Sequence, residues 1–198
     1  MRGQPIRVQG LTVGLLGGSF DPPHEGHVHI TKQALKVFSL SKLWWLVSPG
    51  NPIKKTLPSD LNKRYKASKI IMNHPSVTVT NLECKLNTQF TAETLYKIKK
   101  LYPGIKFVWL MGADNLVNFH RWNNWDWIMK NIPIGVLSRP EEQIRAGLSC
   151  AATRFRKFRL PKERSFLLPY FRPPVWTLII GPMINISSTN LRRENILQ

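Results

Sequence analysis

The sequence predicts an α/β fold in which an open, mostly parallel sheet is covered by helices on both faces. Short apolar runs, typical of buried strands, alternate along the chain with segments of helical periodicity. Strands and helices at this spacing are typical of parallel sheets, which are buried on both faces. The chain has 198 residues, of which 42% are hydrophobic and 20% are charged, so it can form one domain with a sizeable core.

Each expected element follows from a local pattern. Six apolar runs predict strands at residues 12–16, 43–47, 77–80, 105–111, 132–137 and 175–180. Apolar residues at helical spacing predict helices at residues 24–38, 60–72 and 91–101. Ser59 or Asp60 is expected to cap the second helix, and Thr91 is expected to cap the third. Because ligands of parallel sheets bind beyond the carboxyl ends of the strands, we expect the functional site there.

The charge of the chain indicates an anionic ligand. Lysine and arginine number 29 against 11 aspartate and glutamate residues, which gives a formal net charge of +18. Such an excess favours phosphates, nucleotides, nucleic acid or an anionic membrane surface as a partner. No apolar stretch approaches the roughly 20 residues that a spanning helix needs, so we expect no membrane segment.

The N-terminal segment and the cysteines indicate a cytoplasmic protein. Two arginines precede the apolar run 11–16, as in a signal peptide, but the run is short and leads into a polar cluster. We therefore expect residues 1–10 to be an N-terminal extension and residues 11–198 to form a single domain. Cys84 and Cys150 match neither a disulfide framework nor a zinc site, which fits a reducing compartment.

The residues that follow the first strand, 17–27, read GGSFDPPHEGH. The two glycines allow the backbone to approach a ligand closely, and the helix start is expected to offer unpaired N–H groups and a partial positive charge. His24 and His27 are spaced to lie on one face of the first helical turn, and Gly26 leaves room between them. This pattern predicts a pocket whose donors converge on a phosphate chain.

The histidines permit two other interpretations. Metal coordination by His24, His27 and His29 would need a carboxylate or thiol at a helpful local spacing, and none is present. The same side chains could be ordinary capping or core histidines, which the sequence leaves open. The dinucleotide fingerprint G-x-G-x-x-G and the phosphate loop G-x-x-x-x-G-K-[ST] are both absent, so neither of those routes to a nucleotide applies.

A second polar motif, ISSTNLRR at residues 186–193, follows the last predicted strand. Hydroxyl groups at a helix start can donate to phosphate oxygens, and Arg192 can add a charge-assisted contact one turn later. An ordinary helix cap with a solvated arginine pair is the alternative. Because both motifs follow strands of one sheet, we expect them to hold a single triphosphate together.

These motifs carry a family resemblance that spans roughly residues 11–193. The first resembles the G-G-[ST]-F-D-P-x-H-x-G-H signature of the nucleotidyltransferase α/β-phosphodiesterase superfamily, and the second resembles its I-S-S-T-x-[IL]-R motif. FTAETL at residues 90–95, MGAD at residues 111–114 and Trp122 are similar to the bacterial nicotinate-nucleotide adenylyltransferase family. The resemblance implies a Rossmann-like sheet. It also implies transfer of the adenylyl group of ATP to nicotinate mononucleotide in NAD biosynthesis, with Mg2+ accompanying ATP.

The resemblance also implies roles for the ATP-binding residues. His24, His27 and Arg192 would be catalytic. The two histidines would bind the ATP phosphates, with His27 at the α-phosphate, and Arg192 would hold the β and γ phosphates. The other residues implied to contact ATP are Gly17, Gly18, Ser19, Phe20, Gly26, Gly112, Asp114, Ser187 and Ser188. Of these, Gly112 and Asp114 would face the ribose.

Three residues are implied to contact nicotinate mononucleotide. Trp122 would stack on the pyridine ring, and the backbone around Thr91 would meet its carboxylate. The family usually has Pro-His-Lys or Pro-His-Arg in the loop after the second strand, where this chain has Pro-Ile-Lys at residues 52–54. Because Ile53 cannot donate to a phosphate, we expect Lys54 or its neighbour Lys55 to supply the charge there.

A basic run at residues 154–164, with Phe155 and Phe158 interleaved, permits a different function. It could be a nucleic-acid patch, in which case the chain would be an RNA-binding module on a nucleotidyltransferase-like fold. A solvated helix with inward-facing phenylalanines is the favoured interpretation. A further alternative is an adenylyltransferase that prefers nicotinamide mononucleotide. The sequence does not predict an oligomeric state.

Overall fold

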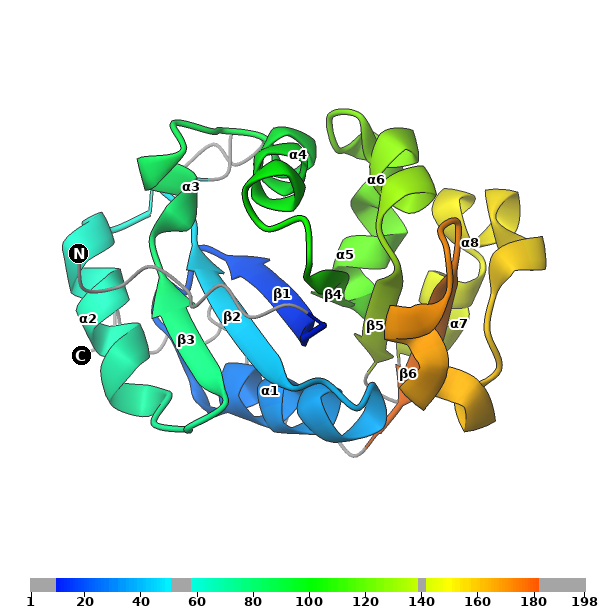
Figure 1. The fold of residues 1–198 in the computed structure, drawn as a ribbon, viewed down its shortest axis with the longest axis horizontal. Helices are drawn as coiled ribbons and strands as arrows, with labels where there is room; N and C mark the ends of the chain where they lie inside the picture. The colour runs from blue at the N-terminus through cyan, green and yellow to red at the C-terminus, as the bar shows by residue number, and fades with distance from the viewer. Residues whose placement is uncertain (1–9, 51–57, 139–141, 182–198) are drawn as a thin grey trace.

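The computed structural model describes residues 10–50, 58–138 and 142–181 (Figure 1). Within these residues, six strands form one sheet in the order β3-β2-β1-β4-β5-β6, and every neighbouring pair is parallel. The strands are β1 (Thr12–Gly18), β2 (Lys42–Val47), β3 (Val77–Thr80), β4 (Lys106–Gly112), β5 (Ile134–Ser138) and β6 (Trp176–Ile180). All six lie where the apolar runs predict them, so the predicted fold class is confirmed.

The longer helices also follow the sequence pattern. They are α1 (Glu25–Val37), α2 (Leu61–Ile71) and α4 (Thr91–Leu101). Shorter helices that we did not predict are α3 (Leu82–Lys85), α5 (Ala113–Asn118), α6 (Trp125–Asn131), α7 (Gln143–Gly147) and α8 (Cys150–Arg154). Three 3-10 helices complete the described part, namely η1 (Phe119–Arg121), η3 (Arg156–Phe158) and η4 (Lys162–Tyr170).

The predicted caps are partly right. Asp60 caps α2, because its Oδ1 accepts a hydrogen bond from the Lys63 amide at 3.0 Å. The predicted cap at Thr91 is wrong. Phe90 is the N-cap of α4 and Thr91 is its first residue, so the helix starts without a side-chain cap.

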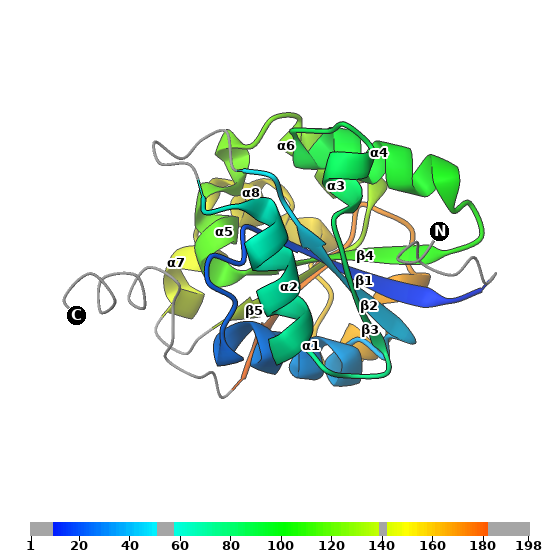
Figure 2. The ribbon, with the colours of Figure 1, turned by 90° about the vertical axis from the view of Figure 1, so that its left-hand side faces the viewer.

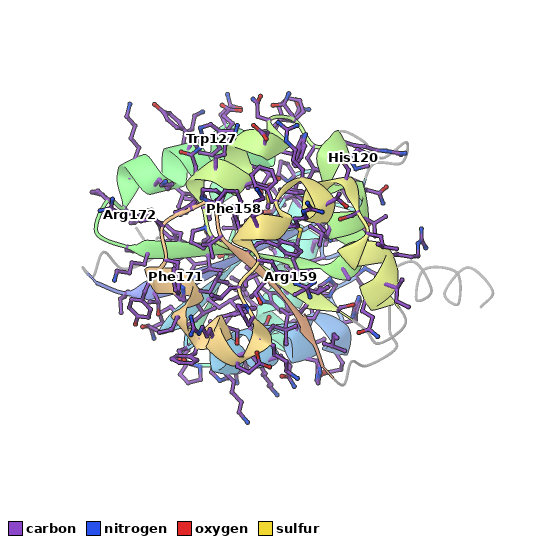
Figure 3. All side chains as sticks on the ribbon, turned by 90° about the vertical axis from the view of Figure 1, so that its right-hand side faces the viewer. His120, Trp127, Phe158, Arg159, Phe171 and Arg172 are labelled. Atoms are coloured by element: carbon purple, nitrogen blue, oxygen red, sulfur yellow. The ribbon has the colours of Figure 1, made fainter. Side chains whose placement is uncertain are left out.

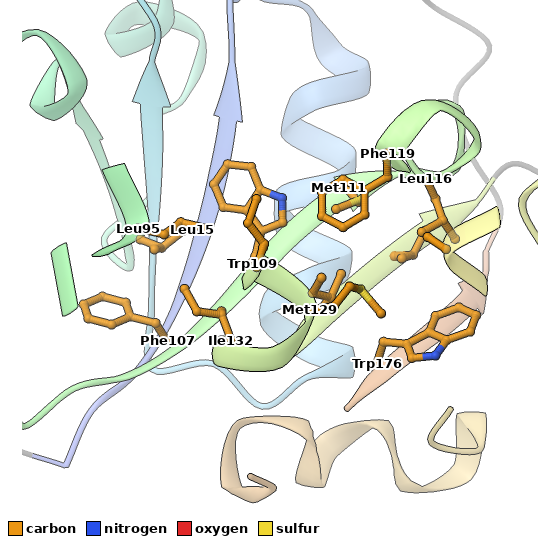
Figure 4. Packing of buried hydrophobic residues seen from close by; sticks show 14 of the residues in the cluster. Leu15, Leu95, Phe107, Trp109, Met111, Leu116, Phe119, Met129, Ile132 and Trp176 are labelled. Carbon is orange, nitrogen blue, oxygen red and sulfur yellow. The ribbon is translucent and has the colours of Figure 1, made fainter. Parts of the chain in front are cut away.

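Two hydrophobic cores lie on opposite faces of the sheet. Val13 and Leu15 of β1 pack in one core with residues of α4, α5 and α6. Leu16 packs in the other core with residues of α1. Figures 1 and 2 show the same layering, with α4 and α6 on one side of the strands and α1 on the other. Trp109 is buried in the first core, as predicted, beside Met111 and Phe119 (Figure 4).

The strand order places a switch point between β1 and β4. On one side of β1 lie β2 and then β3, and on the other side lie β4, β5 and β6 in that order. The connections from β1 and from β4 therefore leave the carboxyl edge in opposite directions, and the crevice between them is the usual ligand site of such sheets. No helix among the described residues is long and apolar enough to cross a membrane.

The basic run does not form the single helix that we predicted. It is divided between the end of α8, η3 and the start of η4. Phe155 is buried, but Phe158 is 46% exposed, so only one phenylalanine faces inward. The guanidinium of Arg159 lies over the Trp176 ring at 5.3 Å, and Figure 3 shows Phe158 and Arg159 on the face beside β6. This arginine therefore packs on the protein itself.

Candidate active site

The turn after β1 contains a residue in an unfavourable backbone conformation. Phe20 has φ of +47°, in the left-handed region, which costs a non-glycine residue roughly 1–2 kcal/mol. Its ring is buried and stacks on the Trp45 indole, with ring centroids 4.5 Å apart and an interplanar angle of 13°. The Phe20 ring is thus held by the core, and only the Phe20 backbone remains to line a ligand site.

Gly17 brings the turn close to the centre of the sheet. A Cβ atom placed on Gly17 would lie 2.5 Å from Cη2 of Trp109, so no larger residue fits without displacing that indole. Trp109 in turn makes an edge contact with Trp122, with ring centroids 6.4 Å apart. Trp122 is half-buried and also packs against Phe119 at 5.2 Å. The predicted residues Gly17 and Trp122 are therefore linked through one buried indole.

His24 and His27 form a reciprocal cap at the start of α1. Nδ1 of His24 accepts a hydrogen bond from the Gly26 amide at 3.1 Å, and Nδ1 of His27 accepts one from the His24 amide at 3.3 Å. The two rings lie together, with centroids 3.9 Å apart. Capping and ligand binding are thus compatible here, because each cap bond uses only one nitrogen of the ring.

The cap corrects one expectation about this helix start. The sequence predicts unpaired N–H groups there, but the Gly26 amide is bonded to His24 and the His27 amide donates to the His24 carbonyl at 2.9 Å. An anion at this helix start would therefore meet the imidazole groups before the backbone. This gives the histidines, rather than the amides, the main part in any contact with phosphate.

The environment of His27 keeps its imidazole neutral. Burial and, to a smaller extent, the charge of His24 together lower the pKa of His27 to about 3, although the hydrogen bond with the His24 backbone opposes both effects. A neutral ring whose Nδ1 accepts a hydrogen bond must carry its proton on Nε2. His27 is therefore a single-proton donor with a fixed orientation at neutral pH.

The end of β4 supplies the second side of the crevice. Gly112 is the last residue of β4 and the N-cap of α5, and Asp114 lies exposed in the first turn of that helix. A Cβ atom on Gly112 would meet Oδ1 of Asp114, so a larger residue there would displace this exposed carboxylate. β1 and β4 are paired up to Leu16 and Leu110, two residues before Gly18 and Gly112 respectively. The structure thus brings the first motif and the MGAD motif to one edge.

The first turn of α4 lies at the same edge of the sheet, because the connection from β3 leads into it. Its N-cap Phe90 makes no side-chain hydrogen bond to the helix start, and the first backbone bond into this turn is donated by Thr94. The amides of Thr91, Ala92 and Glu93 therefore have no acceptor among the described residues. Uncapped amides at a helix start, combined with the helix dipole, favour an anion.

A buried carboxyl group, that of Glu83, follows β3 at a position that no sequence motif distinguishes. Glu83 is 8% exposed, none of the described residues hydrogen-bonds its carboxyl group, and burial raises its pKa to about 7. The folded protein therefore holds a proton here between about pH 4.5 and 7, where the unfolded chain has lost it. Stability due to this group is complete below pH 4.5 and is lost as the pH rises through 7.

Replacement of Glu83 by glutamine is expected to remove this pH dependence. The variant should match the wild type near pH 4 and exceed its unfolding free energy by up to about 3 kcal/mol at pH 8, since one pKa unit corresponds to roughly 1.4 kcal/mol. Urea unfolding at both pH values measures the difference. Glu163→Gln, at an exposed position, is the matched control and should leave the pH profile unchanged.

Four predicted site residues lie outside the described part of the chain. These are Lys54 in the loop after β2 and Ser187, Ser188 and Arg192 in the second motif. Sequence reasoning also missed Arg64. Arg64 is only 2% exposed, and no sequence signal separates this arginine from its basic neighbours on α2.

An all-parallel sheet with two imidazoles and a glycine turn at its switch point is typical of nucleotidyltransferases. The chain belongs to the cytidylyltransferase-like family, which matches residues 15–194. It is 53% identical over 184 residues to "Probable nicotinate-nucleotide adenylyltransferase" of Ruegeria sp. (strain TM1040), covering 93% of this chain and 97% of that one. A protein of the same name from Cereibacter sphaeroides is 52% identical over 182 residues, covering 92% and 96%.

A solved structure shares the fold at low sequence identity. It is "Plasmodium falciparum nicotinic acid mononucleotide adenylyltransferase complexed with NaAD", with a TM-score of 0.68, 19% identity, and coverage of 92% of this chain and 83% of that one. The structural likeness supports the fold, and the sequence relatives support the family. The resemblance to nicotinate-nucleotide adenylyltransferases, predicted from the sequence, is confirmed.

Proposed function

We propose that this chain transfers the adenylyl group of ATP to nicotinate mononucleotide, forming nicotinate adenine dinucleotide and pyrophosphate in NAD biosynthesis. The observation that carries the proposal is the position of His24 and His27 at the switch point, opposite Gly112 and Asp114. The two imidazoles follow the end of β1 and suit the phosphates of ATP. The carboxylate of Asp114 follows the end of the neighbouring β4 and suits the ribose of the same nucleotide. We place this enzyme in the cytoplasm, with residues 11–198 as a single domain.

The imidazoles act as donors to the phosphates. His27 offers its Nε2 proton to the α-phosphate, and His24 contacts the phosphates beside it. A neutral donor costs little to bury, and the arriving phosphate charge raises the pKa of His27 from its low value in the free protein. The contact therefore strengthens as negative charge grows on the α-phosphate during the reaction.

The reaction needs no protein nucleophile. The phosphate of nicotinate mononucleotide is already an anion, and one of its oxygens forms a new bond to the α-phosphorus of ATP. On the opposite side, the bond breaks between that phosphorus and the oxygen that bridges the α and β phosphorus atoms, and pyrophosphate leaves. The protein's part is to position the two nucleotides and to stabilise the developing charge.

Nicotinate mononucleotide lies on the side of α4 and Trp122. The half-buried Trp122, held against Trp109 and Phe119, presents a fixed surface on which the pyridine ring stacks. The uncapped amides at Thr91 accept the ring carboxylate. Ser19 and the glycines at the end of β1 line the turn between the two nucleotides.

The remaining contacts lie outside the described residues and are proposed from the family motifs. Ser187, Ser188 and Arg192 hold the β and γ phosphates, and Lys54 supplies a positive charge in place of the family's loop histidine. No group of three or more His, Cys, Asp or Glu side chains in residues 10–50, 58–138 and 142–181 could hold a metal ion. Mg2+ would enter with ATP, bound through its phosphates, and would supply positive charge near the leaving group.

The proposal is tested by mixing the purified protein with ATP, Mg2+ and nicotinate mononucleotide, without RNA. Pyrophosphate release, with one dinucleotide formed per pyrophosphate, is expected. Release should stop when the mononucleotide is omitted, which excludes ATP hydrolysis. No release, together with tight and strongly salt-dependent RNA binding, would instead support the RNA-binding alternative.

A further inference from the structure

A buried arginine ties together three chain segments at the carboxyl edge of the sheet. Arg64 extends from α2, and its guanidinium donates four hydrogen bonds, all of them to backbone carbonyl oxygens. We infer that Arg64 is a positioning residue, which holds the turn after β1 in the shape that aims the His27 imidazole at the nucleotide. This inference deepens the proposed function and rests on it.

The four acceptors belong to three segments of the chain. Nη1 donates to the Ser19 carbonyl at 2.6 Å and to the Ser48 carbonyl at 2.8 Å, which joins the ends of β1 and β2. Nη2 donates to the Pro49 carbonyl at 3.2 Å, and Nε donates to the Ser59 carbonyl at 2.7 Å. One planar group thus fixes the spacing between the turn after β1, the exit of β2 and the start of α2.

A second set of bonds holds the other side of the same turn. The Ser59 hydroxyl donates to Oδ1 of Asp21 at 2.5 Å, and the Ser59 amide donates to Oδ2 at 3.1 Å. The turn is therefore held at Ser19 by Arg64 and at Asp21 by Ser59. Because Arg64 also bonds the Ser59 carbonyl, these contacts form one closed network around Phe20.

The network reaches the imidazole through Phe20. The Ser19 carbonyl belongs to the peptide group that precedes Phe20, so its bond to Arg64 restrains the residue with φ of +47°. A residue in this region keeps its conformation only where the surroundings impose it. The Phe20 ring packs against the His27 ring, with centroids 4.8 Å apart. Relaxation of the turn would therefore move the ring on which His27 rests.

The geometry requires arginine. A planar guanidinium directs its N–H groups in fixed directions, whereas a lysine ammonium is a compact group with three donors and no fork. Burial lowers the pKa of Arg64, and the nearby carboxylates of Asp21 and Asp60 oppose this shift. Arg64→Lys keeps the positive charge but can satisfy at most three of the four carbonyls, and not in the same directions.

Two variants test the inference by kinetics. Arg64→Lys is expected to lower kcat for adenylyl transfer on the order of 10²-fold, the cost of a small misplacement of reacting groups, with KM for nicotinate mononucleotide nearly unchanged. Ser59→Ala removes one hydrogen bond at an exposed site and should lower kcat by about 3- to 10-fold. Circular dichroism at the assay temperature confirms that each variant is folded. Lys66→Gln, at an exposed position of the same helix, is the control and should keep wild-type kcat.

A second measurement does not depend on activity. The sequence contains five histidines, so their imidazole signals can be titrated separately by NMR. In the wild type and in Lys66→Gln, His27 should stay neutral to a pH well below that of an ordinary histidine. In Arg64→Lys and Ser59→Ala the His27 titration should move towards the ordinary value, because a loosened turn admits water to the ring.

The outcomes separate the inference from the proposed function. A wild type without adenylyl transfer would contradict the proposed function, and the His27 titration would still decide whether Arg64 holds the turn. A folded Arg64→Lys with unchanged kcat and an unchanged His27 titration overturns the inference. If Arg64→Lys does not fold, the same two results for Ser59→Ala overturn it.

Discussion

His27→Ala is expected to lower kcat by about 10²-fold or more at saturating ATP, the usual loss when one transition-state donor is removed. The reason lies in the arrangement at the start of α1. The His24 amide fixes the orientation of the imidazole, and burial keeps it neutral with its proton on Nε2. Alanine leaves this donor position empty. Water that fills it is not held in place and must reorient as charge develops.

Steady-state kinetics with both substrates measures the effect. His29→Ala is the matched control, because His29 lies on the same helix and is assigned no contact with a nucleotide. The control should retain most of the wild-type kcat. Unchanged turnover of His27→Ala would remove His27 from the mechanism.

Discrimination between the acid and the amide mononucleotide is the second large effect. We expect kcat/KM for nicotinate mononucleotide to exceed that for nicotinamide mononucleotide by at least about 10²-fold, because a site built for one polar group can reject an analogue strongly. The carboxylate would satisfy amides at the start of α4 that no side chain caps, and the helix dipole favours its charge. The neutral amide gains neither the charge interaction nor a second acceptor.

Thr91 offers a sharp test of that explanation. Thr91→Pro removes one backbone donor at a position where helices accept proline, and the extended Phe90 before it (φ −109°, ψ 139°) suits a following proline. The variant should lose selectivity for the acid, whereas Thr91→Ala keeps the amide N–H and should keep the selectivity. A wild type that prefers the amide would support the nicotinamide-preferring alternative.

The fold was predictable because its strong signals are periodic. Each strand is an apolar run such as 105–111, and α1 repeats buried residues such as Val28 and Thr31 at helical spacing. Helices of five to seven residues, such as α6 and α8, complete at most about two turns and give too little periodicity to detect. Thr91 was predicted as a cap from its residue type, but the chain uses Phe90 and leaves the helix start open.

The site was predictable where chemistry is local in sequence. Gly17 to His27 form one continuous segment, and the i, i+3 spacing of His24 and His27 brings their rings together as expected. The contacts of Arg64 could not be predicted, because its acceptors are backbone oxygens of three segments that only the fold brings together, and any sequence supplies such oxygens. The low pKa of His27 depends on burial beneath Phe20, which also arises only in the folded chain.

In the proposed mechanism one bound nucleotide attacks the other without a covalent enzyme intermediate, and the stereochemical course at the α-phosphorus reveals whether it does. ATP with a single configuration of sulfur at the α-phosphorus is allowed to react with nicotinate mononucleotide, and the configuration of the dinucleotide is determined. One in-line displacement predicts inversion. Retention would indicate two displacements through an adenylylated protein side chain, and it would rule out direct attack by nicotinate mononucleotide.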